Sequence, residues 1–286
     1  MLLLTACHGG PAPNQGLSDR VRTDADPAAP RVLVVVAHPD DETTFAATIY
    51  KTAVHDGGSV DAVVVTNGEG GFKYATLAER LYGAELTDEA VGRRRLPAIR
   101  RREFLAGAEI MGIDSTWFLD QTDSRYSLDP QEVLDPVHGA WDVPKVRRSL
   151  RSILQGGRYD FVLTMLPHPR THGHHKAATM LALETVAAMP PDRRPVVLAG
   201  TTRDKDEGRV AFRRLKGHPL TEIDTEAGPW VFDRTRRFGH RNRLNYQIVV
   251  NWVIAEHKSQ GTMQLAMNRG QAEAFYLYTL NGPEAP

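Results

Sequence analysis

The sequence predicts an α/β fold of the Rossmann-like, doubly wound kind, in which a mostly parallel sheet is flanked by helices and followed by extra C-terminal elements. Two observations support this prediction. Apolar runs rich in β-branched residues, which suit strands buried on both faces, alternate with helical patterns along the chain. Clusters of His and Asp stand directly after two of those runs, where the ligand crevice of a parallel sheet lies.

The first strand–helix–strand unit is the clearest. Residues 32–37 are a continuous apolar run, VLVVVA, and predict a buried strand with the folded domain beginning at Arg31. A helical stretch over residues 42–54 ends at Asp56-Gly57-Gly58, and residues 60–66 predict the second buried strand. This order is the first βαβ unit of a doubly wound sheet.

The later elements continue this alternation. Residues 72–92 have no clean period and are expected to be an insertion or lid, and residues 99–111 predict a helix that ends at Gly112. The other expected strands lie at residues 115–119, 159–165, 196–199 and 275–280, and the other expected helices at residues 143–154, 174–189 and 242–258. Residues 31–286 are therefore predicted to form one domain.

The composition excludes several classes of protein. The 286 residues carry 35 basic and 35 acidic side chains, which is not the basic footprint of a nucleic-acid-binding domain. No stretch reaches the roughly 18 consecutive apolar residues of a membrane helix. Because Cys7 is the only cysteine, an internal disulfide and a Cys-rich metal site are excluded, and any metal must be held by His and carboxylates.

The N-terminus carries a lipoprotein-like pattern. Leu4-Thr5-Ala6-Cys7 resembles the lipobox of bacterial lipoproteins, in which the cysteine is lipidated, and a stretch rich in Pro, Gly and Asp follows it. Residues 1–30 are therefore expected to be a signal remnant and flexible tether. On this interpretation the protein lies outside the cytoplasm and is anchored to a membrane through Cys7. The alternative is an apolar N-terminus with a chance cysteine on a cytoplasmic protein.

Two polar clusters follow the strands expected at residues 32–37 and 159–165. The first cluster reads AHPDDE over residues 37–42, and the second reads HPRTHGHH over residues 168–175. Each stands at a strand-to-helix turn. Because these turns lie at one edge of a parallel sheet, residues far apart in sequence can meet there in one crevice.

The first cluster indicates a divalent metal ion. Three carboxylates and one imidazole within five residues would repel one another and lose hydration if they were simply buried. His38 and Asp41 can supply two ligands from one turn, while Asp40 is free to accept a proton from bound water. Such nitrogen and oxygen ligands suit zinc, although iron(II) would use the same set. For Glu42 the simpler explanation is a favourable interaction with a helix dipole.

The second cluster offers four histidines within eight residues. It can supply the third metal ligand and a histidine that stabilises or protonates developing charge. Taken alone, it is equally well explained as a solvent-exposed turn rich in His. Its position at a matching strand end favours the metal interpretation, but the residues alone leave open which histidine takes which role.

The AHPDDE run resembles the first signature of the LmbE/PIG-L family of zinc-dependent N-deacetylases, which remove acetyl groups from amino sugars and their conjugates. The family's second signature, H-P-D-H, is similar to residues 172–175, with Gly173 and His174 in place of Pro and Asp. Weaker similarities are the T-x-G-E loop at residues 66–69, an R-x-x-E helix from Arg100 and an H-x-S-Q element at residues 257–260. The resemblance thus extends, with gaps, over about residues 31–260.

This resemblance implies a role for each matching residue. It implies three zinc ligands, namely His38, Asp41 and His175. It makes Asp40 the general base and His172 the residue that polarises the amide oxygen or protonates the leaving amine. Three charged residues are implied to contact the sugar, namely Glu69, Arg100 and Asp123. The departure from H-P-D-H leaves His168 and His174 as rivals for the histidine roles.

The function expected from the residues and the resemblance is metal-dependent removal of an acetyl or other acyl group from the nitrogen of an amino sugar or glycoconjugate. One alternative is a zinc amidase or esterase that acts on a non-sugar substrate. Another is a non-catalytic protein that binds carbohydrate or metal, which would have no need of Asp40. Nucleotide binding is disfavoured because no G-x-G-x-x-G follows the first strand. The expected partner is a small molecule or glycoconjugate, and the oligomeric state stays open.

Overall fold

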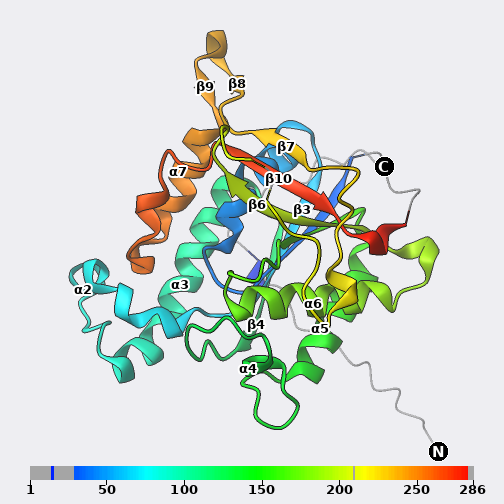
Figure 1. Ribbon diagram of the computed structural model, residues 1–286. Helices are drawn as coiled ribbons and strands as arrows, with labels where there is room; N and C mark the ends of the chain where they lie inside the picture. The colour runs from blue at the N-terminus through cyan, green and yellow to red at the C-terminus, as the bar shows by residue number, and fades with distance from the viewer. Residues whose placement is uncertain (1–13, 16–28, 209, 283–286) are drawn as a thin grey trace, which may run out of the picture.

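The computed structural model describes residues 14–15, 29–208 and 210–282, and an eight-stranded sheet lies at its centre (Figure 1). The strand order is β1-β4-β3-β2-β5-β6-β10-β7. Five neighbouring strands run parallel: β4 Ser115–Gln121, β3 Ser59–Thr66, β2 Arg31–Val36, β5 Phe161–Met165 and β6 Val196–Arg203. Three strands pair antiparallel: β1 Asn14–Gln15, β10 Ala272–Leu277 and β7 Trp230–Asp233. The predicted α/β class with a mostly parallel sheet is confirmed.

Helices cover both faces of the sheet (Figure 1). One face carries α1 Ala46–Tyr50, α3 Glu89–Met111 and α7 Tyr246–Glu256, and the other carries α4 Gln131–Leu134, α5 Val143–Gly157 and α6 Gly173–Ala187. Helix α2, Thr76–Tyr82, lies outside these layers and packs on a small third core. The shorter elements are 3-10 turns at Asp41–Phe45, Glu69–Tyr74, Pro191–Arg193, Pro219–Thr221, His240–Asn242, Lys258–Gln260, Met263–Ala266 and Thr279–Asn281, a π turn at Lys51–His55, and the paired strands β8 Arg237–Phe238 and β9 Leu244–Asn245.

The side chains of strand β2 pack into the hydrophobic cores on both faces of the sheet. Leu33 and Val35 pack in the core beneath α5 and α6, whereas Val32, Val34 and Val36 pack in the core beneath α1, α3 and α7. Successive side chains of a strand point to opposite faces, so a strand that is covered on both sides must be apolar throughout. The continuous VLVVV run therefore belongs in the middle of the sheet, where the structure places it.

Several elements differ in extent from the sequence prediction, and β6, expected at residues 196–199, extends to Arg203. Helix α3 begins at Glu89 rather than residue 99, because the Asp88 side chain accepts a hydrogen bond from the Val91 backbone N at 2.9 Å and caps it. The expected insertion at residues 72–92 is therefore largely helical. Helix α7 begins only at Tyr246, and the terminal strand starts at Ala272 because its residues pair with Leu198–Arg203 of β6.

The N-terminal stretch that was expected to be a tether contains strand β1, which pairs with Ser115 and Thr116 of β4. Cys7 lies outside the described residues, so the lipid anchor and the placement outside the cytoplasm stay predictions. Among the residues that the structure describes, no helix combines the length and the apolar character that crossing a membrane requires.

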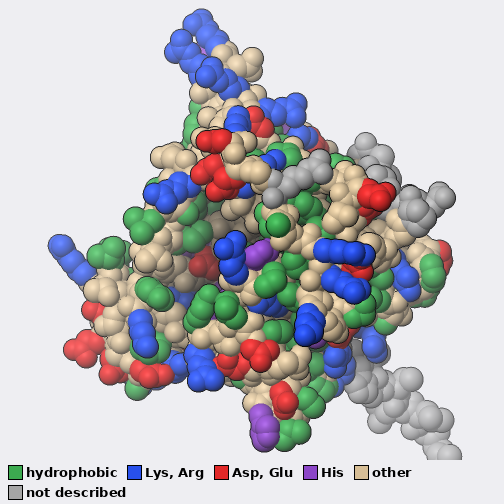
Figure 2. Space-filling model, viewed as in Figure 1, with side chains coloured by type: hydrophobic (Ala, Val, Ile, Leu, Met, Phe, Trp, Pro, Cys, Tyr) green, Lys and Arg blue, Asp and Glu red, His purple; other side chains and the backbone are tan. Residues whose placement is uncertain are grey.

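The carboxyl ends of four parallel strands bring the polar clusters together. His38 follows β2, Glu69 follows β3, Asp123 follows β4 and His172 follows β5. This convergence at one edge of the sheet is the arrangement expected for a doubly wound fold. Acidic, basic and hydrophobic side chains are interspersed over the face shown in Figure 2, so that face is not a uniformly basic surface of the kind that binds nucleic acid.

Candidate metal centre

Two groups of side chains in the described residues have the composition and spacing of a metal site, and both include His38. The first group is His38, Asp41 and His175, which are the ligands that the family resemblance implied. In this group His175 Nε2 lies 3.1 Å from His38 Nδ1 and 3.0 Å from Asp41 Oδ1. The other oxygen of this carboxylate, Asp41 Oδ2, lies 3.6 Å from His38 Nδ1.

Asp41 is held by the backbone of its own turn. Its Oδ2 accepts hydrogen bonds from the Ala37 N at 3.0 Å and the His38 N at 2.8 Å, which leaves Oδ1 facing His175. Burial of Asp41 opposes its ionisation, but the charge of His175 and the hydrogen bonds from His175 and His38 hold the pKa of this carboxyl well below its usual range. Asp41 is therefore a carboxylate, the form that binds metal.

His175 is oriented by its neighbour Thr171. Thr171 Oγ1 lies 3.1 Å from His175 Nδ1, so Nε2 is the ring atom that faces Asp41 and His38. A hydrogen bond to the other ring nitrogen is the usual way in which proteins orient a metal-binding histidine. Sequence reasoning missed Thr171 because a threonine four residues before a histidine carries no signal of its own.

This first group fits a zinc ion. Ligand bonds of roughly 2.0–2.2 Å place neighbouring ligand atoms of a tetrahedron roughly 3.3–3.6 Å apart. The observed separations from His175 Nε2, 3.0 Å to Asp41 Oδ1 and 3.1 Å to His38 Nδ1, are slightly shorter than those values. Two imidazole nitrogens and one carboxylate oxygen also form the three-ligand set that catalytic zinc sites use, with a fourth position left for water or substrate.

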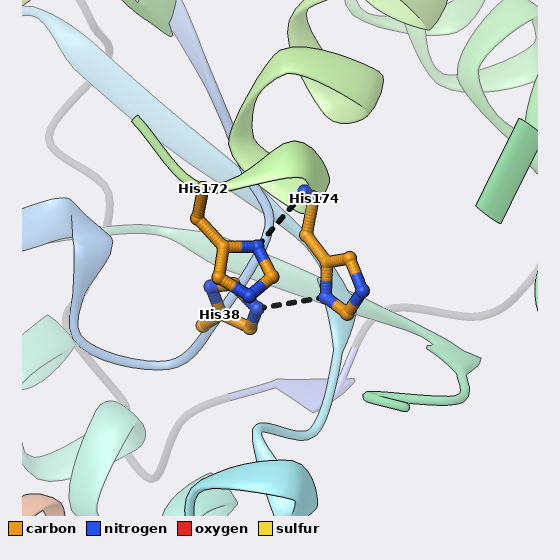
Figure 3. Close-up of side chains that lie close together, drawn as sticks. All are labelled: His38, His172 and His174. Carbon is orange, nitrogen blue, oxygen red and sulfur yellow. Dashed lines mark hydrogen bonds between the residues drawn. The ribbon is translucent and has the colours of Figure 1, made fainter. Parts of the chain in front are cut away.

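The second group is His38, His172 and His174 (Figure 3), and one of its contacts argues against His172 as a ligand. His172 is the N-cap of α6, and its Nδ1 accepts a hydrogen bond from the His174 backbone N at 2.9 Å. An Nδ1 that accepts must be unprotonated, so the neutral ring carries its proton on Nε2. Burial and the nearby charges of His38 and His175 lower the pKa of His172 to about 4. His172 is therefore a neutral hydrogen-bond donor at pH 7.

The two rival histidines lie in different surroundings. His174 is 0% exposed, and its Nδ1 lies 3.1 Å from His38 Nε2. His168 is turned away: its ring packs near Phe212 with the centroids 6.2 Å apart, and its Nδ1 accepts from the Arg170 N. Neither metal-binding group found among the described residues includes His168.

Asp40 has the properties of a general base. Burial, followed by repulsion from Asp41, raises the pKa of Asp40 to about 6. The charges of His257 and His38 act in the opposite direction and limit this rise. A base whose pKa lies slightly below neutrality is ionised at pH 7 and still accepts a proton effectively.

Glu69 and Asp123 lie side by side next to the metal group. Glu69 Oε1 accepts from the Asp123 N at 3.0 Å, and Asp123 Oδ2 accepts from the Gly70 N at 3.0 Å. The other oxygen of Glu69, Oε2, is buried and has no hydrogen-bond partner among the described residues. Buried polar atoms are normally satisfied, so this oxygen is an unused hydrogen-bond acceptor beside Asp123.

The buried Arg100 side chain holds the loop after β3 by hydrogen bonds to its backbone. It is 2% exposed and donates to the Gly68 and Gly71 carbonyl oxygens and to the Ser259 carbonyl oxygen. Gly68 has a φ of 72°, and a Cβ at this position would meet Arg100 Nη1 at 2.8 Å, so the loop requires glycine there. Direct contact between Arg100 and a sugar stays a prediction, as do the substrate roles of Glu69 and Asp123.

A buried ion pair beneath the AHPDDE turn was missed by sequence reasoning. Glu42 Oε1 and His257 Nε2 lie 2.5 Å apart, and both side chains are 0% exposed. Gln260 Nε2 also donates to the Pro39 carbonyl oxygen at 2.5 Å. The H-x-S-Q element at residues 257–260 was the available signal, because two of its polar side chains support this turn.

The fold and the site define the chain as a metal-dependent hydrolase. The family model described as PIG-L, GlcNAc-PI de-N-acetylase, matches residues 33–186, which is more than half of the 286 residues. The chain therefore belongs to the PIG-L family, a family of zinc-dependent hydrolases, and is an enzyme of the deacetylase or amidase type.

Two curated relatives show the range of the family. The chain is 26% identical over 250 residues to a probable N-acetyl-alpha-D-glucosaminyl L-malate deacetylase 2 from Bacillus cereus, a match that covers 86% of this chain and 97% of the relative. It is 31% identical over 166 residues to a mycothiol S-conjugate amidase from Streptomyces coelicolor, covering 55% of this chain and 53% of that protein.

Solved structures share the fold. N,N'-diacetylchitobiose deacetylase from Pyrococcus horikoshii has a TM-score of 0.55 and 18% identity, over 88% of this chain and 85% of that one. A 4-carboxy-2-hydroxymuconate hydratase from Pseudomonas putida KT2440 has a TM-score of 0.50 and 18% identity, over 87% and 95%. Because a hydratase shares the architecture, the reaction must be argued from the side chains of the site.

Proposed function

We propose that the protein removes the N-acetyl group from an amino sugar in a small glycoconjugate. The observation that carries this proposal is the position of Asp40, which adjoins the metal group and is close enough to Asp41 and His38 for their charges to act on its carboxyl. A protein that only bound metal would gain nothing from this base. The names of the family, of the Bacillus cereus relative and of the Pyrococcus horikoshii structure all include the removal of acetyl from an acetylated amino sugar.

The proposed reaction needs a Lewis acid, which zinc would supply, and a general base, which is Asp40. When bound, zinc would supply a Lewis acid that acidifies water and polarises the amide carbonyl. Asp40 accepts the proton that the attacking water loses, since its pKa of about 6 leaves it ionised at pH 7.

His172 supplies a hydrogen-bond donor to the substrate amide. Its Nε2 proton is set by the hydrogen bond to Nδ1 and faces the His38 and His175 rings, whose centroids lie 5.1 and 5.6 Å from its own. From there His172 donates to the amide oxygen as negative charge develops on it. Removal of one such donor typically costs about 10²–10³ in kcat.

The carboxylates beyond the metal group suit a hydroxyl-rich substrate. Sugar hydroxyls both donate and accept hydrogen bonds, and a carboxylate accepts them strongly. The Oε2 of Glu69, which has no hydrogen-bond partner among the described residues, is an acceptor of this kind beside Asp123. A second candidate is an amidase that acts on a non-sugar amide, and the match to the mycothiol S-conjugate amidase supports the amidase activity alone.

Acetate release distinguishes the two candidates. The full chain, stripped with a chelator and reloaded with zinc, is assayed on N-acetylglucosaminides and on a simple acetamide that lacks the sugar. We expect zinc-dependent turnover of the sugars, and we expect Glu69→Gln to raise KM about 10-fold on the sugars alone, the discrimination expected from one lost polar contact. Turnover of non-sugar amides without turnover of any N-acetyl sugar would establish the amidase instead.

A further inference from the structure

We propose that His174 is a positioning residue that presents His38 to the metal, a proposal that rests on the metal site of the proposed function. His174 stands where the H-P-D-H signature has Asp. The role of that Asp in the family therefore does not apply to His174. Figure 3 shows its ring beside that of His38, with one hydrogen bond joining the two.

His38 uses its two ring nitrogens on opposite sides. Nδ1 faces the ligand group, at 3.1 Å from His175 Nε2, and Nε2 faces His174 Nδ1 at the same distance. A nitrogen that binds metal carries no proton, so a neutral His38 in the metal-bound protein has its proton on Nε2. That N–H needs an acceptor, because the side chain is largely buried.

His174 Nδ1 is the acceptor that reaches this proton. The alternative acceptor, Asp123 Oδ1, is 3.9 Å from His38 Nε2, which is too long for a hydrogen bond. Asp123 Oδ1 instead lies 3.3 Å from His174 Nδ1, so this carboxylate oxygen also faces that nitrogen. A histidine side chain at position 174 therefore gives His38 its hydrogen-bond partner.

The His174 ring is itself fixed from three directions. Its Nε2 lies 3.4 Å from Ser124 Oγ, its ring packs against Trp141 with centroids 5.4 Å apart, and its backbone N donates to His172 Nδ1. With Nδ1 accepting from His38, Nε2 carries the proton and points to Ser124. One residue thus sets two tautomers, that of His38 through its side chain and that of His172 through its backbone.

The consequence is measurable as metal affinity. Loss of a hydrogen-bond partner behind a metal-binding histidine typically costs about 10–100-fold in affinity, because the ring loses its orientation and the favoured tautomer. Since the backbone N of residue 174 is unchanged by side-chain substitution, the effect on His38 separates from any effect on His172.

Two variants of His174 separate hydrogen bonding from packing. His174→Asn places an amide oxygen where Nδ1 stood, so it keeps an acceptor but loses the ring. His174→Phe keeps a ring against Trp141 but has no acceptor. His168→Leu, in the same segment but outside both metal groups, is the matched control.

Zinc dissociation constants of the stripped full chain are measured by competition with a chromophoric chelator, together with the visible spectrum of the cobalt(II)-loaded protein. We expect His174→Phe to bind zinc about 10–100-fold more weakly and to shift the cobalt bands, while His174→Asn and His168→Leu stay near wild type. The reverse ranking, with Phe tight and Asn weak, would show that only packing matters and would overturn the proposal.

The same measurement separates this proposal from the proposed function. A wild-type chain that binds no zinc would contradict the metal site itself. Wild-type zinc binding together with equal affinities in all three variants would overturn the role of His174 alone and leave the hydrolase intact.

Discussion

The two turns that form the candidate site are held in place in different ways. The turn at residues 37–42 depends on the far C-terminal part of the chain, because Glu42 pairs with His257 and Gln260 donates to the Pro39 carbonyl oxygen. The turn at residues 168–175 orients its ligand locally, through the contact between Thr171 and His175. The metal group therefore joins one turn that the C-terminal part of the chain supports and one turn whose ligand, His175, is oriented by a residue four positions away.

This difference predicts which substitutions act on the chemistry alone and which act through the fold. Substitutions of a ligand or of the base should directly change metal binding or kcat. Substitutions at His257 should instead lower the free energy of unfolding and so affect the site indirectly. Thr171 should affect only the affinity for metal.

The largest effect is expected for Asp41→Ala. This variant removes a ligand oxygen and also the acceptor of the Ala37 and His38 backbone N–H groups. We expect no zinc to be retained after dialysis against buffer without metal, and activity at the background of the assay. Elemental analysis of the dialysed protein checks the first point, and retention of one zinc per chain would remove Asp41 from the ligand set.

Asp40→Asn should keep zinc and lose most turnover. General-base catalysis contributes about 10²–10⁴-fold, so kcat should fall by that factor at unchanged metal content. In the wild type, kcat/KM should decline with falling pH below about pH 6, because the pKa of Asp40 is about 6 and only its ionised form accepts a proton. Residual turnover of the variant should lack this acid limb. Near-normal kcat in a zinc-loaded Asp40→Asn protein would contradict the role of base.

His257→Leu tests the support that comes from the C-terminal part. It leaves Glu42 buried without its partner, which should lower the free energy of unfolding by about 3–5 kcal/mol. Urea denaturation of the stripped protein measures this loss. The double variant Glu42→Leu/His257→Leu has no unpaired buried charge at this place. Its free energy of unfolding should therefore be close to that of the wild type. A loss below about 1 kcal/mol in the single variant would mean that the pair does not support the turn.

Thr171→Val is expected to have the smallest effect. It removes the hydroxyl that orients His175 and should weaken zinc binding about 10-fold, the lower end of the range for such supporting contacts. Stability of the stripped protein should hardly change, in contrast to His257→Leu. Thr185→Val, near the C-terminal end of α6, is the control, because its hydroxyl donates to the Leu181 carbonyl oxygen. Equal zinc affinity in both variants would mean that His175 needs no local support.

Local sequence was sufficient for the five parallel strands, for β10 and for the candidate ligands, but it did not predict β1 or β7. The apolar run of β2 identified a central strand, since only a strand covered on both faces is apolar at every position. His38 and Asp41 could be paired as ligands because they lie within one turn. The start of α3 was placed ten residues too late, because its first three turns are rich in Arg and lack an apolar stripe.

The roles of the histidines required the tertiary structure. The sequence shows four histidines in the second cluster but not which nitrogen of each ring is protonated, and only the N-cap contact of His172 and the His38–His174 contact decide that. Arg100 is similar: the resemblance implied a sugar contact, and only the structure shows that its donors hold the loop after β3.

The sequence by itself determined the fold class, the family signature and the pairing of His38 with Asp41, because each depends on residues close together in the chain. Only the tertiary structure decided that Glu42 pairs with His257, that Arg100 is buried and that His174 lies behind His38. Those contacts join residues more than 100 positions apart or depend on which face of a helix is covered. They arise from the packing of β2, β5, α3 and α7 around one sheet, which no local pattern of residues records.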